Sequence, residues 1–227
     1  MIMTQLNNIW ETLKFVSDQD PLTQNQIEVL LPVLQKEVKA REIKRIQYLL
    51  QRSGIKRIKR MDDFDWKFNP KIPREKIMAI YNSSWFEDVH NIVFIGPAGV
   101  GKSHMGDAFC YQAIQRGLPT ARITCFDLVA KLKKSKNKDN LLQYYATIKV
   151  FCLDELGYVF PTQEQANDIF QIISKRSELL PTLVTTNLVP SKWGKIFEAA
   201  TATAILDRLS LNGQFISWEG RSYRKSG

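Results

Sequence analysis

The segment from Ile92 to Ser103 constrains the fold of this chain more than any other. Four apolar residues at 92–95 are followed by Gly-Pro-Ala-Gly-Val-Gly-Lys-Ser, which is typical of a strand that enters a phosphate-binding loop and then a helix, the Walker A pattern. The backbone N–H groups of such a loop wrap a phosphate, and side chains at its glycines would hold the backbone away from the ligand. We therefore expect ATP to bind here.

The loop offers both backbone and side-chain ligands. Lys102 is expected to reach the β- and γ-phosphates, and the Ser103 hydroxyl is expected to bind Mg²⁺. The predicted nucleotide-binding residues are those of the loop itself: Gly96, Pro97, Ala98, Gly99, Val100, Gly101, Lys102 and Ser103.

From residue 91 onward the hydrophobic pattern alternates between strands and helices. The predicted strands lie at 91–95, 121–125, 148–153, 182–186 and 214–218, and the predicted helices at 102–116, 127–145, 163–177 and 202–210. Gly117 is expected to end the first helix, and Thr162 to Gln165 form a capping box before the third. The sequence thus predicts an α/β fold with a parallel five-stranded sheet flanked by helices.

A second acidic motif follows an apolar strand at 150–153. Asp154 and Glu155 end this strand, and the carboxyl ends of parallel strands meet at one edge of the sheet, beside the phosphate loop. This is a Walker B pattern, in which Asp154 would hold Mg²⁺ and Glu155 would act as general base on the attacking water. Asn187 ends the next strand and is expected either to orient that water or to serve as a turn residue.

Positive charge is concentrated in two places. Residues 36–60 carry ten Lys and Arg against two Glu, and five lysines lie within 131–138. Such concentration is typical of a protein that neutralises the phosphates of DNA, although a solvated basic helix face is the alternative. The candidate DNA contacts are Arg41, Lys44, Arg45, Arg52, Lys56, Arg57, Lys59, Arg60, Lys133 and Lys134.

The periodicity also predicts the domain organisation. Apolar residues at helical spacing predict one or two helices over 22–52, ended by Ser53 and Gly54. We predict a basic, helical DNA-binding domain at 1–60, an aromatic linker at 61–75 that packs on the rest of the chain, and an ATPase domain at 76–227.

Several classes of protein and site are not indicated. No apolar run approaches the ~20 residues of a spanning helix, and the N-terminus lacks the pattern of a signal peptide, so we expect a cytoplasmic protein with no membrane partner. Cys110, Cys125 and Cys152 are expected to be buried thiols, and the two histidines are too few for a metal cluster. No metal other than Mg²⁺ is predicted.

Together the motifs resemble those of a known family. The chain resembles the IstB family, AAA+ ATPases encoded by bacterial insertion sequences and related to the DnaC helicase loaders and the DnaA initiators. Besides the phosphate loop, the resemblance rests on Asp63–Pro70, Asp154–Tyr158, Thr186–Leu188, Trp193–Gly194, Ala204–Leu209 and Ser222–Arg224.

The resemblance implies roles for several residues. Asn187 is similar to the sensor 1 residue, Arg208 to the arginine finger that reaches the ATP of a neighbouring subunit, and Arg224 to the second sensor arginine. Relatives often carry an acid where this chain has Arg221, so the second-sensor role stays open between Arg221 and Arg224. On spacing alone Arg208 and Arg224 could each be surface salt bridges. The chain stops three residues after Arg224, and we expect no C-terminal helical lid.

The resemblance also implies an activity. Members bind ATP, form nucleotide-dependent homo-oligomers on duplex DNA with little sequence preference, and deliver that DNA to a transposase that they stimulate in transposition. A helicase loader of the DnaC type, with a replicative helicase as partner and a preference for single strands, is the alternative. A P-loop kinase and a non-hydrolysing DNA scaffold are further rivals, the former disfavoured by Glu155, which suits water as acceptor.

Overall fold

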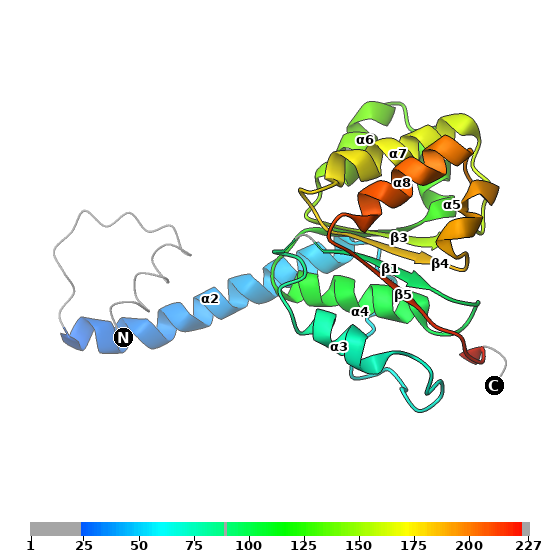
Figure 1. The fold of residues 1–227 in the computed structure, drawn as a ribbon. Helices are drawn as coiled ribbons and strands as arrows, with labels where there is room; N and C mark the ends of the chain where they lie inside the picture. Colours follow the sequence, from blue (N-terminus) through cyan, green and yellow to red (C-terminus); the bar gives the residue numbers. More distant parts are fainter. Residues whose placement is uncertain (1–23, 89, 224–227) are drawn as a thin grey trace. The chain divides into compact units, whose positions relative to one another are not determined.

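The structure is a computed structural model of the 227-residue chain, and it describes residues 24–88 and 90–223. The chain divides into two compact units between Tyr48 and Leu49 (Figure 1). None of the helices in the described ranges is long and apolar enough to cross a membrane.

The first unit contains most of helix α2 (Gln24–Arg52). The prediction of helix over 22–52 is confirmed over 24–52 as a single element, residues 22 and 23 lying outside the described residues, and its end lies at Ser53 and Gly54 as expected. The Ser53 hydroxyl donates to the Leu50 carbonyl at 2.8 Å, and Gly54 has a φ of +82°. A left-handed residue directly after a helix stops it because the chain leaves the helical path there.

The second unit is built on a five-stranded sheet in the order β2-β3-β4-β1-β5, in which every pair is parallel. The predicted fold class is thereby confirmed. The strands are β1 (Asn91–Ile95), β2 (Thr120–Thr124), β3 (Val150–Leu156), β4 (Thr182–Thr186) and β5 (Gly213–Ser217).

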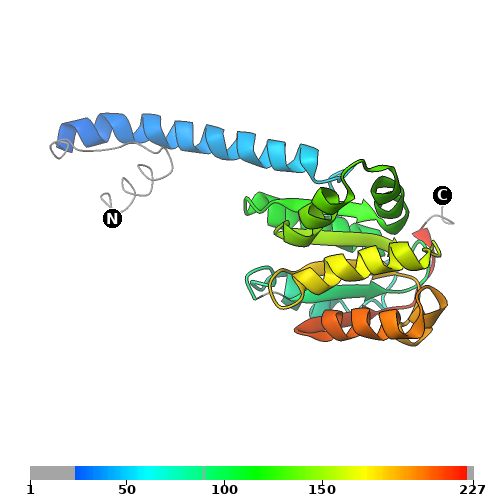
Figure 2. The ribbon, with the colours of Figure 1, turned by 90° about the horizontal axis from the view of Figure 1, so that it is seen from above.

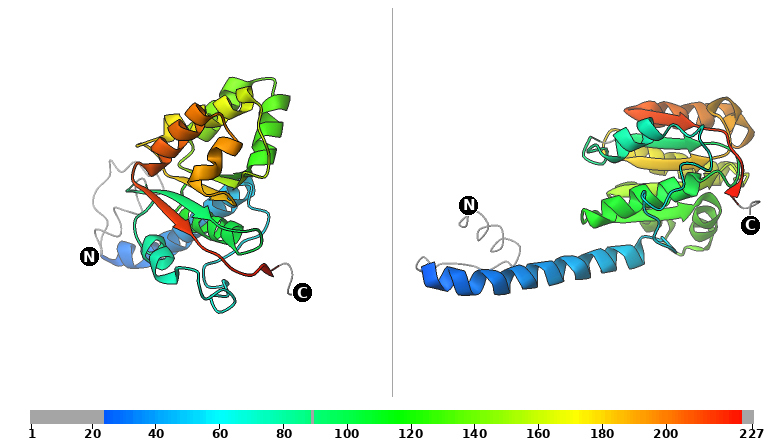
Figure 3. Two further views of the ribbon diagram at one scale, coloured as in Figure 1. Left: turned by 45° about the vertical axis from the view of Figure 1, so that its right-hand side comes forward. Right: turned by 90° about the horizontal axis from the view of Figure 1, so that it is seen from below.

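Helices cover both faces of the sheet. One face carries α5 to α8 and the other carries α3 and α4 (Figures 1 and 3). The elements are α3 (Arg74–Tyr81), α4 (Lys102–Gln115), α5 (Cys125–Lys134), α6 (Lys138–Thr147), α7 (Gln163–Arg176), the 3-10 helix η1 (Pro190–Lys195) and α8 (Ala199–Ser210). Figure 2 views the sheet from the side of α7 and α8.

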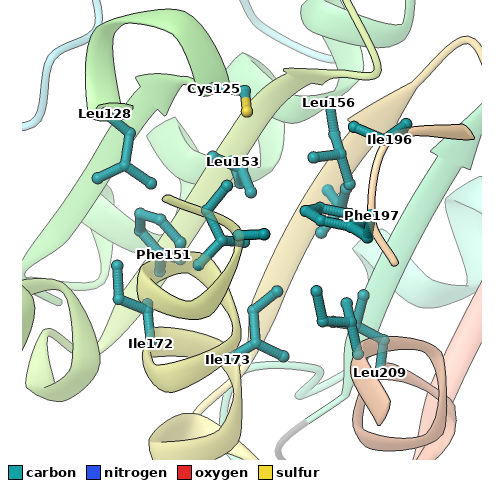
Figure 4. Close-up of a cluster of buried hydrophobic side chains, with 14 of the residues drawn as sticks. Cys125, Leu128, Phe151, Leu153, Leu156, Ile172, Ile173, Ile196, Phe197 and Leu209 are labelled. Atoms are coloured by element: carbon teal, nitrogen blue, oxygen red, sulfur yellow. The ribbon is translucent and has the colours of Figure 1, made fainter. Parts of the chain in front are cut away.

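Strand β3 contributes to two cores at once. Phe151 and Leu153 pack under α5 and α7 (Figure 4), whereas Val150 and Cys152 pack on the α4 face. Because both faces are buried, the strand reads as an unbroken apolar run and not as an alternating one. The thiols of Cys110, Cys125 and Cys152 are free and buried, as expected.

The prediction of one helix over 127–145 is wrong. Two helices replace it, because Ser135 takes an extended conformation after α5 and the Asn137 side chain caps α6 by accepting from the Asn140 N–H at 3.2 Å. Serine and asparagine compete with the helical backbone through such local bonds. The lysine cluster of 131–138 therefore spans a helix break.

Other boundaries differ by a few residues. Strand β2 ends at Thr124 and not at 125, because the Thr124 side chain caps α5 by accepting from the Asp127 N–H at 3.0 Å. Helix α8 begins at Ala199 instead of 202, and α3 was not predicted at all. The capping box at Thr162 and the left-handed Gly117 after α4 are confirmed.

Arg176 ties α6 to the start of two strands. Its side chain is fully buried. The guanidinium donates to the carbonyls of Tyr145 at 3.0 Å, Ile148 at 2.6 Å and Pro181 at 2.7 Å. Burial lowers the pKa of Arg176 to about 9, so the group stays charged at neutral pH and satisfies carbonyls that water cannot reach.

Arg176→Met should lower the free energy of unfolding by about 3 kcal/mol, because it leaves several buried carbonyls without donors. Urea denaturation monitored by circular dichroism measures the change. The matched control is Lys175→Met on the exposed side of the same helix turn, which should stay within about 0.5 kcal/mol of the wild type. Equal effects of the two substitutions would contradict the role of Arg176.

Candidate active site

The loop between β1 and α4 needs glycine at two positions. Gly99 and Gly101 have φ angles of +80° and +101°. A Cβ on Gly99 would lie 2.1 Å from Ser222 Oγ, and one on Gly101 would lie 2.6 Å from Phe64 Cε2. The backbone angle and the close approach of neighbours both exclude larger residues.

The segment after β5 holds this loop in place. The Trp218 backbone N–H donates to the Ile95 carbonyl at 3.0 Å, and its indole N–H donates to the Val100 carbonyl at 3.3 Å. The Tyr223 N–H donates to the Gly99 carbonyl at 3.0 Å. Three donors from one segment therefore fix the path of the loop.

Lys102 is the first residue of α4, so the positive end of that helix faces the loop. Its side chain is buried, and the ammonium group donates to the Pro97 carbonyl at 2.6 Å. This contact folds the lysine back over the loop, where a phosphate held by the loop would meet it.

The Asp154 carboxylate is buried at the end of β3 and is the centre of the site. The Ser103 hydroxyl donates to its Oδ1 atom at 3.0 Å, and the Thr185 hydroxyl donates to the same atom. The Arg122 guanidinium donates to Oδ2. Ser103 and Asp154 together offer the hard oxygen ligands that Mg²⁺ prefers beside phosphates, and they fit that ion.

Arg122 and Thr185 were not among the predicted site residues. Arg122 lies on the edge strand β2, and Thr185 lies on β4. The signal for Arg122 was its position as a charged residue inside a predicted strand. A threonine in a strand, by contrast, carries no sequence signal, because β-branched residues are common there.

Glu155 follows Asp154 and takes a left-handed backbone conformation with a φ of +59°. Its N–H donates to the Thr185 hydroxyl at 3.0 Å. Glu155 lines the same cavity as Lys102 and Ser103. A non-glycine residue in this conformation is strained, and such strain is often found at functional positions.

Asn187 lies beside the turn after β3. Its buried Oδ1 atom has no hydrogen-bond partner among the described residues, and it would be 2.8 Å from a Cβ on Gly157. A buried amide oxygen without a partner is costly unless a ligand or water satisfies it. Asn187 does not itself contribute to the lining of the cavity.

A cavity of about 280 Å³ opens in front of the loop. The predicted loop and acidic residues meet there, and so do residues from the segment that precedes the sheet. The lining comprises Lys59, Asp63, Phe64, Asp65, Gly99, Gly101, Lys102, Ser103, His104, Glu155, Tyr158, Thr185 and Tyr223.

The aromatic segment at 61–75, predicted to be a linker, therefore forms one wall of the site. The Tyr223 hydroxyl donates to the Asp65 carboxylate at 2.8 Å, and the rings of Tyr223 and Phe68 lie 3.9 Å apart. The hydrogen bond from Tyr223 lowers the pKa of Asp65 and raises that of Tyr223. The linker and the segment after β5 are thus joined to each other beside the loop.

Arg208 lies near the amino-terminal end of β1, whereas the phosphate loop lies at the carboxyl-terminal end of that strand. Its carbonyl accepts from the side chain of Asn91, the first residue of β1. Its guanidinium donates to the Ser174 hydroxyl at 3.2 Å and lies over the Phe170 ring. The structure therefore does not bring Arg208 to the cavity of its own chain.

The two arginines near the C-terminus are placed differently. Arg224 lies outside the described residues. The Arg221 guanidinium lies over the Phe68 ring, 5.1 Å from its centroid, and donates to the Phe68 carbonyl at 3.4 Å. Arg221 thus contacts the linker and is absent from the lining of the cavity.

The predicted DNA contacts are mostly exposed. The exception is Lys59, whose ammonium group forms an ion pair with Asp107 at 3.0 Å. Arg41 is paired on the helix surface with Glu37 at 2.7 Å. The exposed members are Arg41, Lys44, Arg45, Arg52, Lys56, Arg57, Arg60, Lys133 and Lys134.

Known proteins resemble the chain over nearly its whole length. The family described as IstB-like ATP binding protein matches residues 3–227. The insertion sequence IS232 putative ATP-binding protein of Bacillus thuringiensis subsp. berliner is 33% identical, over 87% of this chain and 81% of that protein. The replicative helicase loader DnaC of Buchnera aphidicola is 25% identical, over 93% of this chain and 89% of its own.

Solved structures share the fold. The crystal structure of DnaI matches with a TM-score of 0.61 and 20% identity, over 72% of this chain and 89% of that chain. The AMPPCP-bound DnaA of Aquifex aeolicus matches with a TM-score of 0.58 and 15% identity, over 70% of this chain and 49% of its own. At such identities the likeness concerns the fold alone.

Gly99→Ala should weaken the binding of a fluorescent ATP analogue about tenfold or more, because a left-handed non-glycine residue costs about 1–3 kcal/mol and the methyl group meets Ser222. Fluorescence anisotropy measures the affinity. Gly194→Ala is the matched control, since nothing lies within 4 Å of a Cβ at that position. Unchanged affinity in Gly99→Ala would show that the loop is not the nucleotide site.

Proposed function

The chain belongs to the family of IstB-like ATP-binding proteins, and from this premise we propose that it is a Mg²⁺-dependent ATPase of an insertion sequence. In this proposal the protein acts in the cytoplasm, assembles on duplex DNA with little sequence preference, and stimulates a partner transposase. Several similar proteins are named as ATP-binding proteins of insertion sequences, which supports a role for this chain in an insertion sequence.

The observation that carries the proposal is the contact between Ser103 and Asp154 at 3.0 Å, in a cavity that Glu155 also lines. Ser103 and Asp154 would hold Mg²⁺, and this ion would neutralise the charge that develops on the β- and γ-phosphates. Lys102 binds those phosphates, and Glu155 accepts a proton from the attacking water. Asn187, whose amide oxygen lacks a partner among the described residues, orients that water.

The position of Arg208 supports a site shared between subunits. Its backbone lies near the start of β1, away from the phosphate loop at the end of that strand, and its guanidinium contacts Ser174 and Phe170. In the proposed assembly it therefore meets the nucleotide of a neighbouring subunit. An arginine supplied in trans stabilises the transition state and makes hydrolysis depend on assembly. Arg224 or Arg221 is proposed to complete the site as the second sensor.

The exposed basic residues of 41–60, with Lys133 and Lys134, support DNA binding. In the proposed complex they contact phosphates, which position the duplex without reading its sequence. Because ATP lies between subunits in this proposal, the bound nucleotide determines whether the subunits assemble. Assembly in turn determines the affinity for DNA. Hydrolysis then releases the DNA.

A helicase loader is the second candidate function. The 25% identity to a DnaC protein over 93% of this chain favours it. In that function the N-terminal segment would bind a replicative helicase, and the preferred DNA would be single-stranded.

Arg208→Ala and Glu155→Gln should each lower ATP turnover about 10²- to 10⁴-fold, since the first lacks the arginine finger and the second lacks the general base. A mixture of the two inactive proteins should recover measurable turnover, because the intact base of one variant meets the intact arginine of the other. Phosphate release measures turnover. Full activity of Arg208→Ala alone would exclude the shared site, and full activity of Glu155→Gln would favour the non-hydrolysing scaffold.

Duplex DNA should bind with a steep dependence on salt, losing about 10³-fold or more in affinity between 50 and 200 mM if six or more phosphates are contacted. Arg57→Gln should reduce the slope by about one, and Lys71→Gln, outside the proposed contact set, should leave it unchanged. Competition between duplex and single-stranded oligonucleotides in the presence of ATP distinguishes the two functions, because preference for single strands would favour the helicase loader.

A further inference from the structure

One partly buried arginine, Arg122, is shared by two carboxylates beside the cavity. Arg122 donates from Nε to Asp107 Oδ1 at 3.0 Å and from Nη2 to Asp154 Oδ2. Burial opposes the charge of Arg122, but Asp154 and Asp107 outweigh it and raise the pKa of the guanidinium. The guanidinium is therefore a fixed positive charge. A stronger hydrogen bond from it to one carboxylate weakens its hydrogen bond to the other.

The second oxygen of Asp107 holds Lys59. The ammonium group lies 3.0 Å from Asp107 Oδ2, and about a third of its side chain is exposed, 36% against 9% for Asp107. Lys59 thus connects the basic segment, residues 36–60, to Arg122 through the single carboxylate of Asp107. A partly exposed cation of this kind can exchange a carboxylate for a phosphate of DNA.

The segment that carries Lys59 is fixed on either side. The Ser53 carbonyl accepts from the Arg122 backbone N–H at 2.6 Å, and the Arg60 carbonyl is bonded to a ring nitrogen of His104 at 2.8 Å. Residues 53–60 therefore run from the edge strand β2 to the first turn of α4. Lys59 thus lies next to β2, which supplies Arg122, and α4, which supplies Ser103.

The charges of the cluster balance. Asp107 and Asp154 are matched by Lys59 and Arg122, so a divalent cation at Asp154 adds two positive charges to a neutral and mostly buried group. Such charges are screened weakly. Withdrawal of Lys59 leaves the cluster with one excess negative charge, which favours a cation, and it leaves Asp107 free to draw Arg122 away from Asp154.

We propose that Arg122 is a positioning residue for Asp154, and that the Lys59–Asp107 ion pair couples DNA contact at the basic segment to cation binding at the nucleotide site. When Lys59 contacts a phosphate, Arg122 shifts its hold toward Asp107, and the Asp154 carboxylate becomes available. By reciprocity, a bound cation and nucleotide strengthen DNA binding by the same factor. The coupling rests on the proposed function, whereas the role of Arg122 does not.

Two substitutions test the relay without DNA, and the proposal gives them opposite signs. Lys59→Met imitates the withdrawn lysine and should lower the Mg²⁺ concentration needed for half-maximal binding of a non-hydrolysable fluorescent ATP analogue about fivefold. Asp107→Asn leaves Arg122 to Asp154 alone and should raise that concentration by a similar factor. A role in folding alone would not move the two variants in opposite directions.

Lys71→Met is the control for the loss of one positive charge, since Lys71 is exposed and does not line the cavity. Far-UV circular dichroism and thermal unfolding establish that every variant is folded. Shifts of Lys59→Met and Asp107→Asn in the same direction, or shifts no larger than that of Lys71→Met, would overturn the proposal.

Addition of duplex DNA then tests the coupling. The Mg²⁺ requirement of the wild type should fall about fivefold, and that of Lys59→Met should not change while DNA remains bound. A wild type that binds DNA with an unchanged Mg²⁺ requirement would refute the coupling. A wild type that binds no DNA would refute the proposed function, and the DNA-free variants would still decide the role of Arg122.

Discussion

The buried carboxylate of Asp154 is the interaction on which the site depends. An ionised carboxylate away from water is tolerated only when partners satisfy it, and here the partners come from three different elements. Ser103 lies in the first turn of α4, Thr185 lies on β4, and Arg122 lies on β2. Their convergence on the end of β3 fixes the phosphate loop, the acidic motif and the edge of the sheet relative to one another.

Segments that precede and follow the sheet complete the site around this centre. Phe64 packs against Gly101, and Ser222 packs against Gly99, so the loop is enclosed by residues distant in sequence. The Tyr223–Asp65 hydrogen bond joins these two segments. Residues of the segment at 61–75 and of the loop line the same cavity, so in the proposed function a bound nucleotide would lie against both.

The local motifs could be predicted because each is carried by a contiguous stretch with its own chemistry. A strand, a glycine loop and a helix follow one another at 92–115, and Asp154 and Glu155 directly follow an apolar run. The helix break at Ser135 was missed because the apolar periodicity continues across it, whereas short polar side chains decide the backbone locally. The roles predicted for Asn187, Arg208 and the basic residues stay predictions.

The sequence by itself determined the fold class, the phosphate loop and the acidic pair, because these depend on neighbours in the chain. Only the tertiary structure decided the partners of Asp154 and the place of Lys59. By sequence Lys59 is one more cation in a basic run, but the fold sets it beside Asp107, and through Arg122 beside the carboxylate of the site. The physical reason is that ion pairs form between side chains that the fold brings together, and spacing along the chain does not record that proximity.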